Sequence, residues 1–484
     1  MATPGPDLKA FQLLRAGRYA EAVVFARQAV AGKRRCVPAH GMLASILLSL
    51  GRTDEAAQVV DQALASEPGE ADAYDGLAHV SMRLGKHEQA NALYRRAAEV
   101  APSDPRFWYN LASSERSLGR LQEAQDACDR AISLDATQYP SYLLRSELRV
   151  QTPEANHVQE LRDRLAATAA DDRARMFLGY ALAKELDDLG AYDEAFGWYA
   201  QGASARRKRL AYDVSVDERK LLRIEEAFAV AGSGGRRPNG DPAKFVFIVG
   251  LPRSGTTLLE RLLSGLPHVA SNGETDNFSR ALLNATPAGP EDVFTRAATA
   301  EPAAVAAAYA RFAAGRDGAT VVEKLPMNYL YLGAIQRALP DAALLLMTRS
   351  PLDSCFAMFR TLFGEAYPFS YDFEDLARYY AAYARLTSHW KAILGDALHE
   401  VRYEALVEQP AGVGAAAAGH CGLVWSDDAV DIQNNRSASY TASAAQIRRP
   451  IYATSRDRWR HYRAHLGPLV EALRRHGVEA SLED

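Results

Sequence analysis

The chain has 484 residues, 48% of them hydrophobic, enough for roughly two or three folded units. Lysine and arginine number 56 against 60 aspartates and glutamates, a net charge of -4 that excludes the broad basic surface of a nucleic-acid-binding protein. No apolar run approaches the ~20 residues that a bilayer-spanning helix needs, and no basic stretch with an apolar core opens the chain. We therefore expect a cytoplasmic protein with no nucleic-acid and no membrane partner, in which any anion site is local.

The four cysteines do not form a metal-binding or disulfide pattern. Cys36, Cys128, Cys355 and Cys421 lie far apart in the sequence, without metal-ligand spacing. We predict that they are small buried apolar residues and that the protein holds no metal.

A short pattern recurs in the first third of the chain. It consists of glycine, a basic residue, two variable residues and then Glu-Ala or Gln-Ala, and its glycines are Gly17, Gly51, Gly85 and Gly119, a constant step of 34 residues. Further small residues and a proline follow at matching offsets in the second and third units: Ala63, Leu64 and Pro68, then Ala97, Ala98 and Pro102. Small residues allow the helices of a hairpin to approach closely, and the proline ends the second helix.

This period and register resemble tetratricopeptide repeats. A less regular unit is expected at 190–195, after a weaker stretch from about 137 to 175. Such hairpins stack into a curved solenoid whose groove would hold a peptide, protein or glycan. The alternative is that the array packs on the following domain or forms a homodimer. A stretch rich in glycine, proline and polar residues ends the array, which predicts a repeat domain at 1–230, a linker at 231–243 and a second domain at 244–484.

The second domain opens with a strand, a loop and a helix. Residues 244–249 are an apolar β-rich run, 250–257 read Gly-Leu-Pro-Arg-Ser-Gly-Thr-Thr, and 258–263 have helical character. Backbone N–H groups in such a loop surround a phosphate or sulfate. A phosphate-loop nucleotidase would carry lysine after the second glycine, but this chain has Thr256 there and Arg253 as the nearby cation.

A second apolar strand, 342–348, ends in Arg349, where a triphosphate-hydrolysing site would have an aspartate for magnesium. Both substitutions favour a metal-free transfer. A sulfuryl group carries less negative charge than a terminal phosphoryl group, so backbone donors and a few cations suffice. We therefore expect a parallel α/β sheet flanked by helices, with its anion site at the carboxyl ends of the strands.

Residues 247–274 resemble the cofactor-loop region of sulfotransferases, in particular the protein-tyrosine sulfotransferases and the bacterial repeat-fused sulfotransferases, and the resemblance extends over about 244–465. It implies that 3'-phosphoadenylyl sulfate, PAPS, is the cosubstrate. Five loop residues would cradle its 5'-phosphosulfate, namely Arg253, Ser254, Gly255, Thr256 and Thr257. Arg349 would bind the 3'-phosphate. The family usually has a serine eight residues after that arginine, whereas this chain has Ala357, and Ser354, one helical turn earlier, is the candidate substitute.

The resemblance also assigns the remaining site residues. Glu274 matches the general base of the tyrosine sulfotransferases, although a carboxylate there also suits the start of a helix. Lys324 lies in the segment 321–328, which is predicted as a short strand with a charged tip. It would stabilise charge on the leaving oxygen, or else lies at a solvated strand end. Further cofactor contacts are assigned to Tyr403, in a predicted strand over 398–406, and to three residues of the C-terminal loop: Ser443, Arg448 and Arg458.

The sequence thus predicts an α-helical repeat solenoid followed by an α/β sulfotransferase domain that transfers a sulfuryl group from PAPS to an acceptor hydroxyl. A peptide tyrosine is one expected acceptor, and glycan, lipid or small-molecule hydroxyls stay open. Two alternatives also stay open. One is an interaction scaffold whose transferase-like domain is inactive, which Ala357 favours, and the other is a phosphotransferase that uses the same loop with ATP and magnesium.

Overall fold

The computed structural model describes residues 5–32, 37–66, 69–229, 243–286, 292–313, 319–435, 451 and 457–483. The chain forms two compact units. The first comprises Met1–Ser141, Asn277–Pro287 and Ala303–Gly315, and the second comprises Tyr142–Asp276, Ala288–Pro302 and Arg316–Asp484. Residues 230–242, which make up most of the predicted linker, lie outside the described residues.

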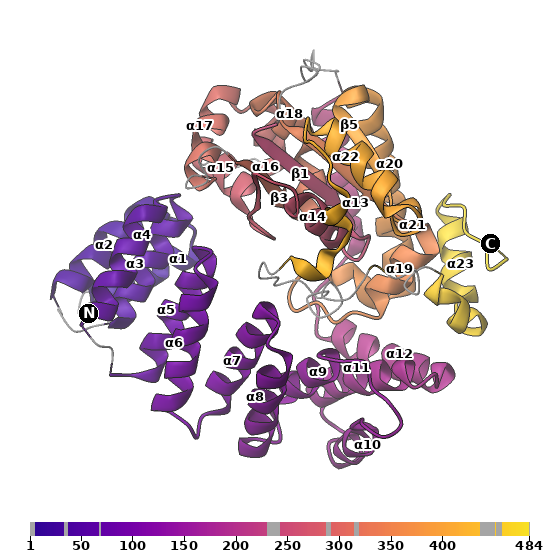
Figure 1. Ribbon diagram of the computed structural model, residues 1–484, viewed down its shortest axis with the longest axis horizontal. Coiled ribbons are helices and arrows are strands. Elements are labelled where there is room, and N and C mark those ends of the chain that lie inside the picture. Colours follow the sequence, from indigo (N-terminus) through magenta and orange to yellow (C-terminus); the bar gives the residue numbers. More distant parts are fainter. Residues whose placement is uncertain are drawn as a thin grey trace. The chain divides into compact units, whose positions relative to one another are not determined.

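The first unit contains successive antiparallel helical hairpins, coloured indigo to purple in Figure 1. Their helices are α1 (Pro6–Arg15), α2 (Tyr19–Gly32), α3 (Val37–Ser49), α4 (Thr53–Ala65), α5 (Ala71–Arg83), α6 (His87–Val100), α7 (Pro105–Leu118) and α8 (Leu121–Leu134).

The repeated glycine ends the first helix of each hairpin. Gly85 and Gly119 have φ of 73° and 82°, a left-handed conformation that glycine adopts without strain. The next residue then bonds back into the helix, as when the N–H of Arg120 donates to the carbonyl of Glu115 at 2.9 Å. The recurring alanines lie completely buried where the two helices touch: Ala22, Ala56, Ala90 and Ala124. Each position in the repeated pattern therefore has a structural cause.

Two helices from the second half of the sequence belong to this first unit. They are α15 (Asn277–Ala285) and α17 (Pro302–Phe312). Arg280 and Asn284 of α15 donate to the carbonyls at the end of α3, Leu48 at 3.4 Å and Ser49 at 3.5 Å. The ring of Phe312 lies so close to Gly51 that a Cβ there would meet it at 3.0 Å.

The second unit begins with more helices. α9 (Tyr139–Glu147) spans the boundary in sequence, and α10 (Val158–Ala167), α11 (Asp172–Asp188), α12 (Tyr192–Lys208) and α13 (Val214–Ala227) follow. Helices α11 and α12 form the less regular hairpin that the sequence predicts. Gly190 between them has φ of 79°, the N–H of Ala191 donates to the carbonyl of Leu186 at 2.9 Å, and Ala195 is completely buried.

A five-stranded parallel sheet forms the core of the second unit, with strand order β2-β3-β1-β4-β5. The strands are β1 (Phe245–Gly250), β2 (Val269–Ser271), β3 (Thr320–Lys324), β4 (Ala343–Thr348) and β5 (Leu398–Arg402). Every residue of β1 is buried, as a central parallel strand requires. The predicted strand over 398–406 is wrong at its end, because the strand stops at Arg402 and a helix begins at Tyr403.

The further helices of this unit are α14 (Thr256–Ser264), α16 (Val293–Thr299), α18 (Leu332–Ala338), α19 (Pro351–Phe359), α20 (Phe373–Leu394), α21 (Tyr403–Glu408), α22 (Pro410–His420) and α23 (Gly467–Arg475). Short 3₁₀ segments include η1 (Pro326–Tyr331), η2 (Pro368–Tyr371) and η8 (Arg458–His465). The predicted architecture of helical repeats followed by an α/β domain with a parallel sheet is confirmed.

The α11–α13 helices pack directly on the sheet domain. The hydroxyl of Tyr180 on α11 donates to the carbonyl of Phe359 at 2.9 Å, and Arg207 on α12 donates to Asp375 at 2.7 Å. Helix α13 packs along α20, where Glu218 accepts from Arg378 at 2.9 Å. This part of the helical array is therefore part of the same compact unit as the sheet.

The cysteines that the structure describes, Cys128, Cys355 and Cys421, are buried as predicted, and Cys36 lies outside the described residues. Within the described ranges, no helix combines the length and apolarity needed to cross a bilayer.

Candidate active site

The predicted anion loop joins the end of β1 to the start of α14. Gly250 has φ of 151°, and a Cβ there would lie 2.4 Å from the carbonyl oxygen of Met347. Gly255 has φ of 98°, and a Cβ there would lie 2.5 Å from the ring of Tyr403. Both positions therefore require glycine. Ser254 is buried, and its Oγ donates to the carbonyl of Leu251 at 2.7 Å, which closes the loop on itself.

The backbone amides of the loop lead into the N-terminus of α14, where Thr256 and Thr257 are both buried. Helix amides at this end carry partial positive charge and have no partners within the helix itself. The loop thus combines tight backbone geometry with the donors that an anion needs.

Two arginines meet at this loop. Nη1 of Arg349, which follows β4, donates to the carbonyl of Arg253 at 3.0 Å. The guanidinium of Arg349 also lies over the ring of Tyr403, 4.4 Å from its centre. The structure therefore brings Arg253, Arg349 and Tyr403 together, although they come from the carboxyl ends of three different strands.

Asp353 on α19 is a further neighbour of Arg349, with 3.3 Å between its Oδ2 and Nη2 of the arginine. Burial raises the pKa of the Asp353 carboxyl, and Arg349 only partly offsets this. Ser354 beside it is buried, and its Oγ donates to the carbonyl of Arg349 at 3.3 Å, at the start of the helix. Ala357, also buried, lies one turn later on the same helix.

The predicted base and the predicted lysine are in direct contact. Nζ of Lys324, the last residue of β3, lies 2.7 Å from Oε1 of Glu274. The lysine side chain is completely buried, whereas the glutamate, in the loop between β2 and α15, is 33% exposed. Lys324 therefore does not lie at a solvated strand end, and Glu274 precedes the helix instead of starting it.

A third charged residue completes this group. Oε2 of Glu260, on α14, lies 3.4 Å from Nζ of Lys324, and its other oxygen accepts a hydrogen bond from the hydroxyl of Ser271. The Ser271 oxygen in turn accepts the N–H of Gly273 at 2.9 Å. One buried lysine is thus shared by two carboxylates, of which only Glu274 was predicted.

The loop that carries Glu274 is also held by Glu323, a completely buried residue of β3. It accepts from Nδ2 of Asn272 at 3.1 Å and from the hydroxyl of Thr275. Neither Glu260 nor Glu323 was predicted from the sequence. The sequence does carry a signal for both residues, since Glu260 stands within an apolar helix and Glu323 within an apolar strand. A charge buried at such a position is rarely unpaired, so each glutamate indicates a partner elsewhere in the fold.

An aromatic segment lies before η2, in the same unit. Tyr367 has φ of 54°, uncommon for a residue other than glycine, and its ring packs edge-on against Phe363 with 4.8 Å between ring centres. Burial raises the pKa of Tyr367, and the negative charge of Glu274 raises it further. Arg206 on α12 donates to the carbonyl of Gly364 in this segment.

Arg458 forms an ion pair with an aspartate of α11, and its contact with the cofactor stays a prediction. Its guanidinium pairs with Oδ2 of Asp187 on α11 at 2.5 Å, and Asp187 also accepts from Arg360 at 3.1 Å and from the hydroxyl of Tyr462. Burial alone would raise the pKa of Asp187, but the two arginines and Tyr462 together lower it. The predicted contacts of Ser443 and Arg448 lie outside the described residues.

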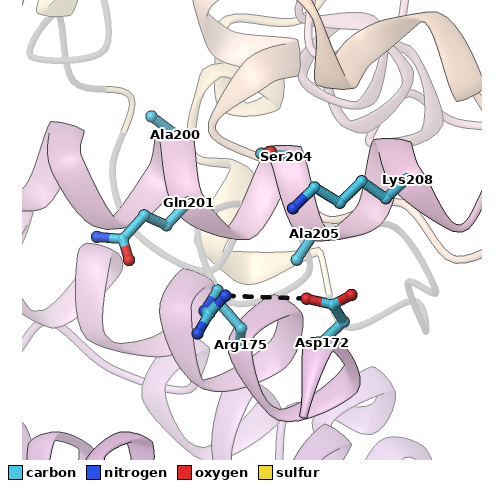
Figure 2. Close-up of a pocket in the computed structure, with 7 residues that line it drawn as sticks. All are labelled: Asp172, Arg175, Ala200, Gln201, Ser204, Ala205 and Lys208. Atoms are coloured by element: carbon cyan, nitrogen blue, oxygen red, sulfur yellow. Dashed lines mark ion pairs between the residues drawn. The ribbon is translucent and has the colours of Figure 1, made fainter. Parts of the chain in front are cut away.

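A hollow of about 340 Å³ lies between α11 and α12. Figure 2 shows Asp172 and Arg175 of α11, 3.9 Å apart, facing side chains of α12. The hollow is lined by Asp172, Arg175, Ala200, Gln201, Ser204, Ala205 and Lys208, and none of these is a predicted site residue. Across the described part of the chain, no group of three or more His, Cys, Asp or Glu side chains is placed to hold a metal ion.

Comparison with known proteins identifies the two parts of the chain. The sulfotransferase family matches residues 246–427, and tetratricopeptide repeat families match residues 13–80 and 76–141. The fold and the loop define an α/β domain with an anion loop, joined to helical repeats. The chain thus combines a domain that matches the sulfotransferase family with tetratricopeptide repeats, which is the composition that the sequence predicts.

The individual relatives and solved structures share low sequence identity with this chain. An uncharacterized protein of Aquifex aeolicus (strain VF5) is 26% identical over 332 residues, which cover 65% of this chain but only 44% of that protein. The sulfotransferase domain from the Synechococcus PCC 7002 olefin synthase is 18% identical, with 51% of this chain and 99% of that one covered and a TM-score of 0.36. Pseudomonas aeruginosa pilF is 20% identical, with 40% of this chain and 88% of that one covered and a TM-score of 0.31.

Proposed function

We propose that this chain transfers a sulfuryl group from PAPS to an acceptor hydroxyl. The contact between Lys324 and Glu274 carries the proposal, because it places a buried cation and a partly exposed carboxylate together at the carboxyl ends of the strands. The family match supports a transferase of the sulfotransferase type. The identity of the donor and the acceptor belongs to the proposal.

The residues of the loop suit the donor. Backbone amides of 253–257 and the N-terminus of α14 would bind the 5'-phosphosulfate, and the side chain of Arg253 adds a positive charge. Arg349, fixed over Tyr403 and against the loop backbone, would bind the 3'-phosphate. These groups supply positive charge and N–H donors from protein atoms alone.

In the proposed reaction the acceptor oxygen attacks sulfur in line with the bond to the bridging phosphate oxygen. The new O–S bond forms as the bridging S–O bond breaks, and adenosine 3',5'-bisphosphate leaves with the electron pair. Glu274 takes the proton of the acceptor hydroxyl, since it is the more exposed member of the pair. Lys324 stabilises the charge that develops on the bridging oxygen.

For the acceptor we propose a peptide tyrosine, which the likeness to tyrosine sulfotransferases suggests. The repeat array would bind the peptide, protein or glycan that carries the acceptor, as repeats of this kind generally mediate peptide or protein interactions. A homodimer and a cytoplasmic location remain predictions alongside it.

The test combines binding with transfer. We expect adenosine 3',5'-bisphosphate to bind with micromolar affinity in a calorimetric titration, and radiolabelled sulfuryl transfer from PAPS to fall at least ~100-fold in Glu274→Gln and Lys324→Ala. Glu225→Gln, which removes a partner of Arg385 on the outside of α20, is the matched control and should keep full activity.

The two alternatives predict other results. An inactive scaffold, which Ala357 favours, would not bind the bisphosphate. A phosphotransferase would need ATP and magnesium and would ignore PAPS. Unchanged transfer in both Glu274→Gln and Lys324→Ala would refute the proposed mechanism.

A further inference from the structure

Lys324 is held between two carboxylates, and the proposed mechanism uses only one of them. Glu260 lies on α14, the helix that starts at the anion loop, and it is buried. Its distance to Nζ of Lys324, 3.4 Å, is longer than the 2.7 Å from Glu274. Glu260 is therefore a second partner for the same buried ammonium, attached to a different element.

The mechanism requires the tighter contact to open. While Lys324 and Glu274 neutralise each other, the lysine is not on the bridging oxygen and the glutamate is not on the acceptor hydroxyl. A buried ammonium that loses its only carboxylate is costly, because little water is available to replace it. With Glu260 in place, Lys324 keeps an anionic partner when Glu274 turns to the acceptor.

Glu260 also holds the loop that carries the base. Its second oxygen accepts from Ser271, whose oxygen accepts from the N–H of Gly273, immediately before Glu274. The carbonyl of Gly273 accepts from the N–H of Lys324 at 3.2 Å. The Glu260 carboxylate is thus linked to Lys324 through an ion pair and to Glu274 through hydrogen bonds to the preceding loop.

We propose that Glu260 is a positioning residue of the transfer reaction, which holds the Lys324 ammonium in place while Glu274 releases it to act on the acceptor. This inference rests on the proposed function of the site.

The test is a double-mutant cycle between Glu260 and Lys324. We expect Glu260→Gln to lower kcat about 100-fold, as a small displacement of catalytic groups does, with PAPS KM and bisphosphate affinity within about 2-fold of wild type. Glu260→Asp, which keeps the charge on a shorter stem, should recover part of kcat. In the Lys324→Ala background, Glu260→Gln should have little further effect, because the residue acts through the lysine.

An equal loss of kcat in both backgrounds would overturn the proposal, since a merely structural role would not depend on Lys324. Unchanged kcat in Glu260→Gln would overturn it as well. Melting temperatures complete the same cycle without any acceptor. Each single variant should have a lower melting temperature than wild type. The decrease in the double variant should be smaller than the sum of the two single decreases, and an additive decrease would contradict the coupling.

The failure of the proposed function has a different signature. In that case the wild-type chain neither binds the bisphosphate nor transfers a sulfuryl group, while the melting cycle still reports whether Glu260 and Lys324 are coupled. Glu225→Gln serves again as the control for folding.

Discussion

Replacing Asp187 by asparagine should destabilise the second unit by about 3 kcal/mol. Asp187 is buried on α11 and accepts hydrogen bonds from Arg360, Arg458 and Tyr462. Asparagine keeps the shape and one acceptor oxygen but removes the charge, so two guanidinium groups lose their common anion.

The size of the loss in unfolding free energy depends on how well water can hydrate the two arginines once the Asp187 charge is removed. Breaking a fully buried ion pair by removing one partner costs about 3–5 kcal/mol. The side chains of Arg360 and Arg458 are 18% and 28% exposed, so each recovers part of its hydration and the loss falls at the lower end. Urea unfolding of Asp187→Asn and of wild type measures it. The matched control is Asp193→Asn on α12, where the carboxylate beside His465 is 87% exposed and the change should stay within ~0.5 kcal/mol.

The pH dependence gives an independent check. The net effect of its partners holds the pKa of Asp187 below its ordinary value in the folded state. Its stabilising contribution is therefore complete above the unfolded-state pKa, near 4, and is lost as pH falls through the folded-state pKa. The difference between wild type and Asp187→Asn should be full at pH 7 and shrink in acid. A difference at pH 7 below ~1 kcal/mol, or one that stays constant as the pH falls, would refute this account.

Three further substitutions test the anion loop and the repeats. Gly255→Ala should weaken bisphosphate binding at least ~10-fold in a calorimetric titration. The reason is that the new Cβ would lie 2.5 Å from the ring of Tyr403, in a left-handed backbone conformation. Unchanged affinity would mean that the loop rearranges without a free-energy cost. Arg349→Lys should weaken the same binding about 10-fold, since lysine lacks the planar group that stacks on Tyr403 and bonds the Arg253 carbonyl; an equal affinity would place the 3'-phosphate elsewhere. Gly119→Ala should lower the free energy of unfolding by about 1 kcal/mol, because φ there is 82°, and a neutral result would indicate another helix ending.

The repeats could be predicted from the sequence because each of their signals is local. Gly119 ends a helix through its own backbone, and Ala124 is small because the partner helix of the same hairpin touches it. The loop around Gly255 was predictable for the same reason, as strand, loop and helix follow one another directly.

The rest depends on contacts between distant parts of the chain. Arg458 pairs with Asp187, which lies 271 residues earlier in the sequence, and no local sequence pattern predicts that pair. The group formed by Glu260, Lys324 and Glu274 needs one helix, one strand and one loop to converge on a single point. Sequence reasoning found the two members that the family resemblance names and missed Glu260, which only the fold brings to them.

The packing of α13 against α20 has a consequence for anyone who dissects or recombines this protein. A fragment that starts at β1 would leave Arg378 without Glu218, Asp375 without Arg207 and the carbonyl of Phe359 without Tyr180. A fragment that starts at residue 142 would keep those partners, but its helices α15 and α17 would lose the repeats that belong to their own compact unit.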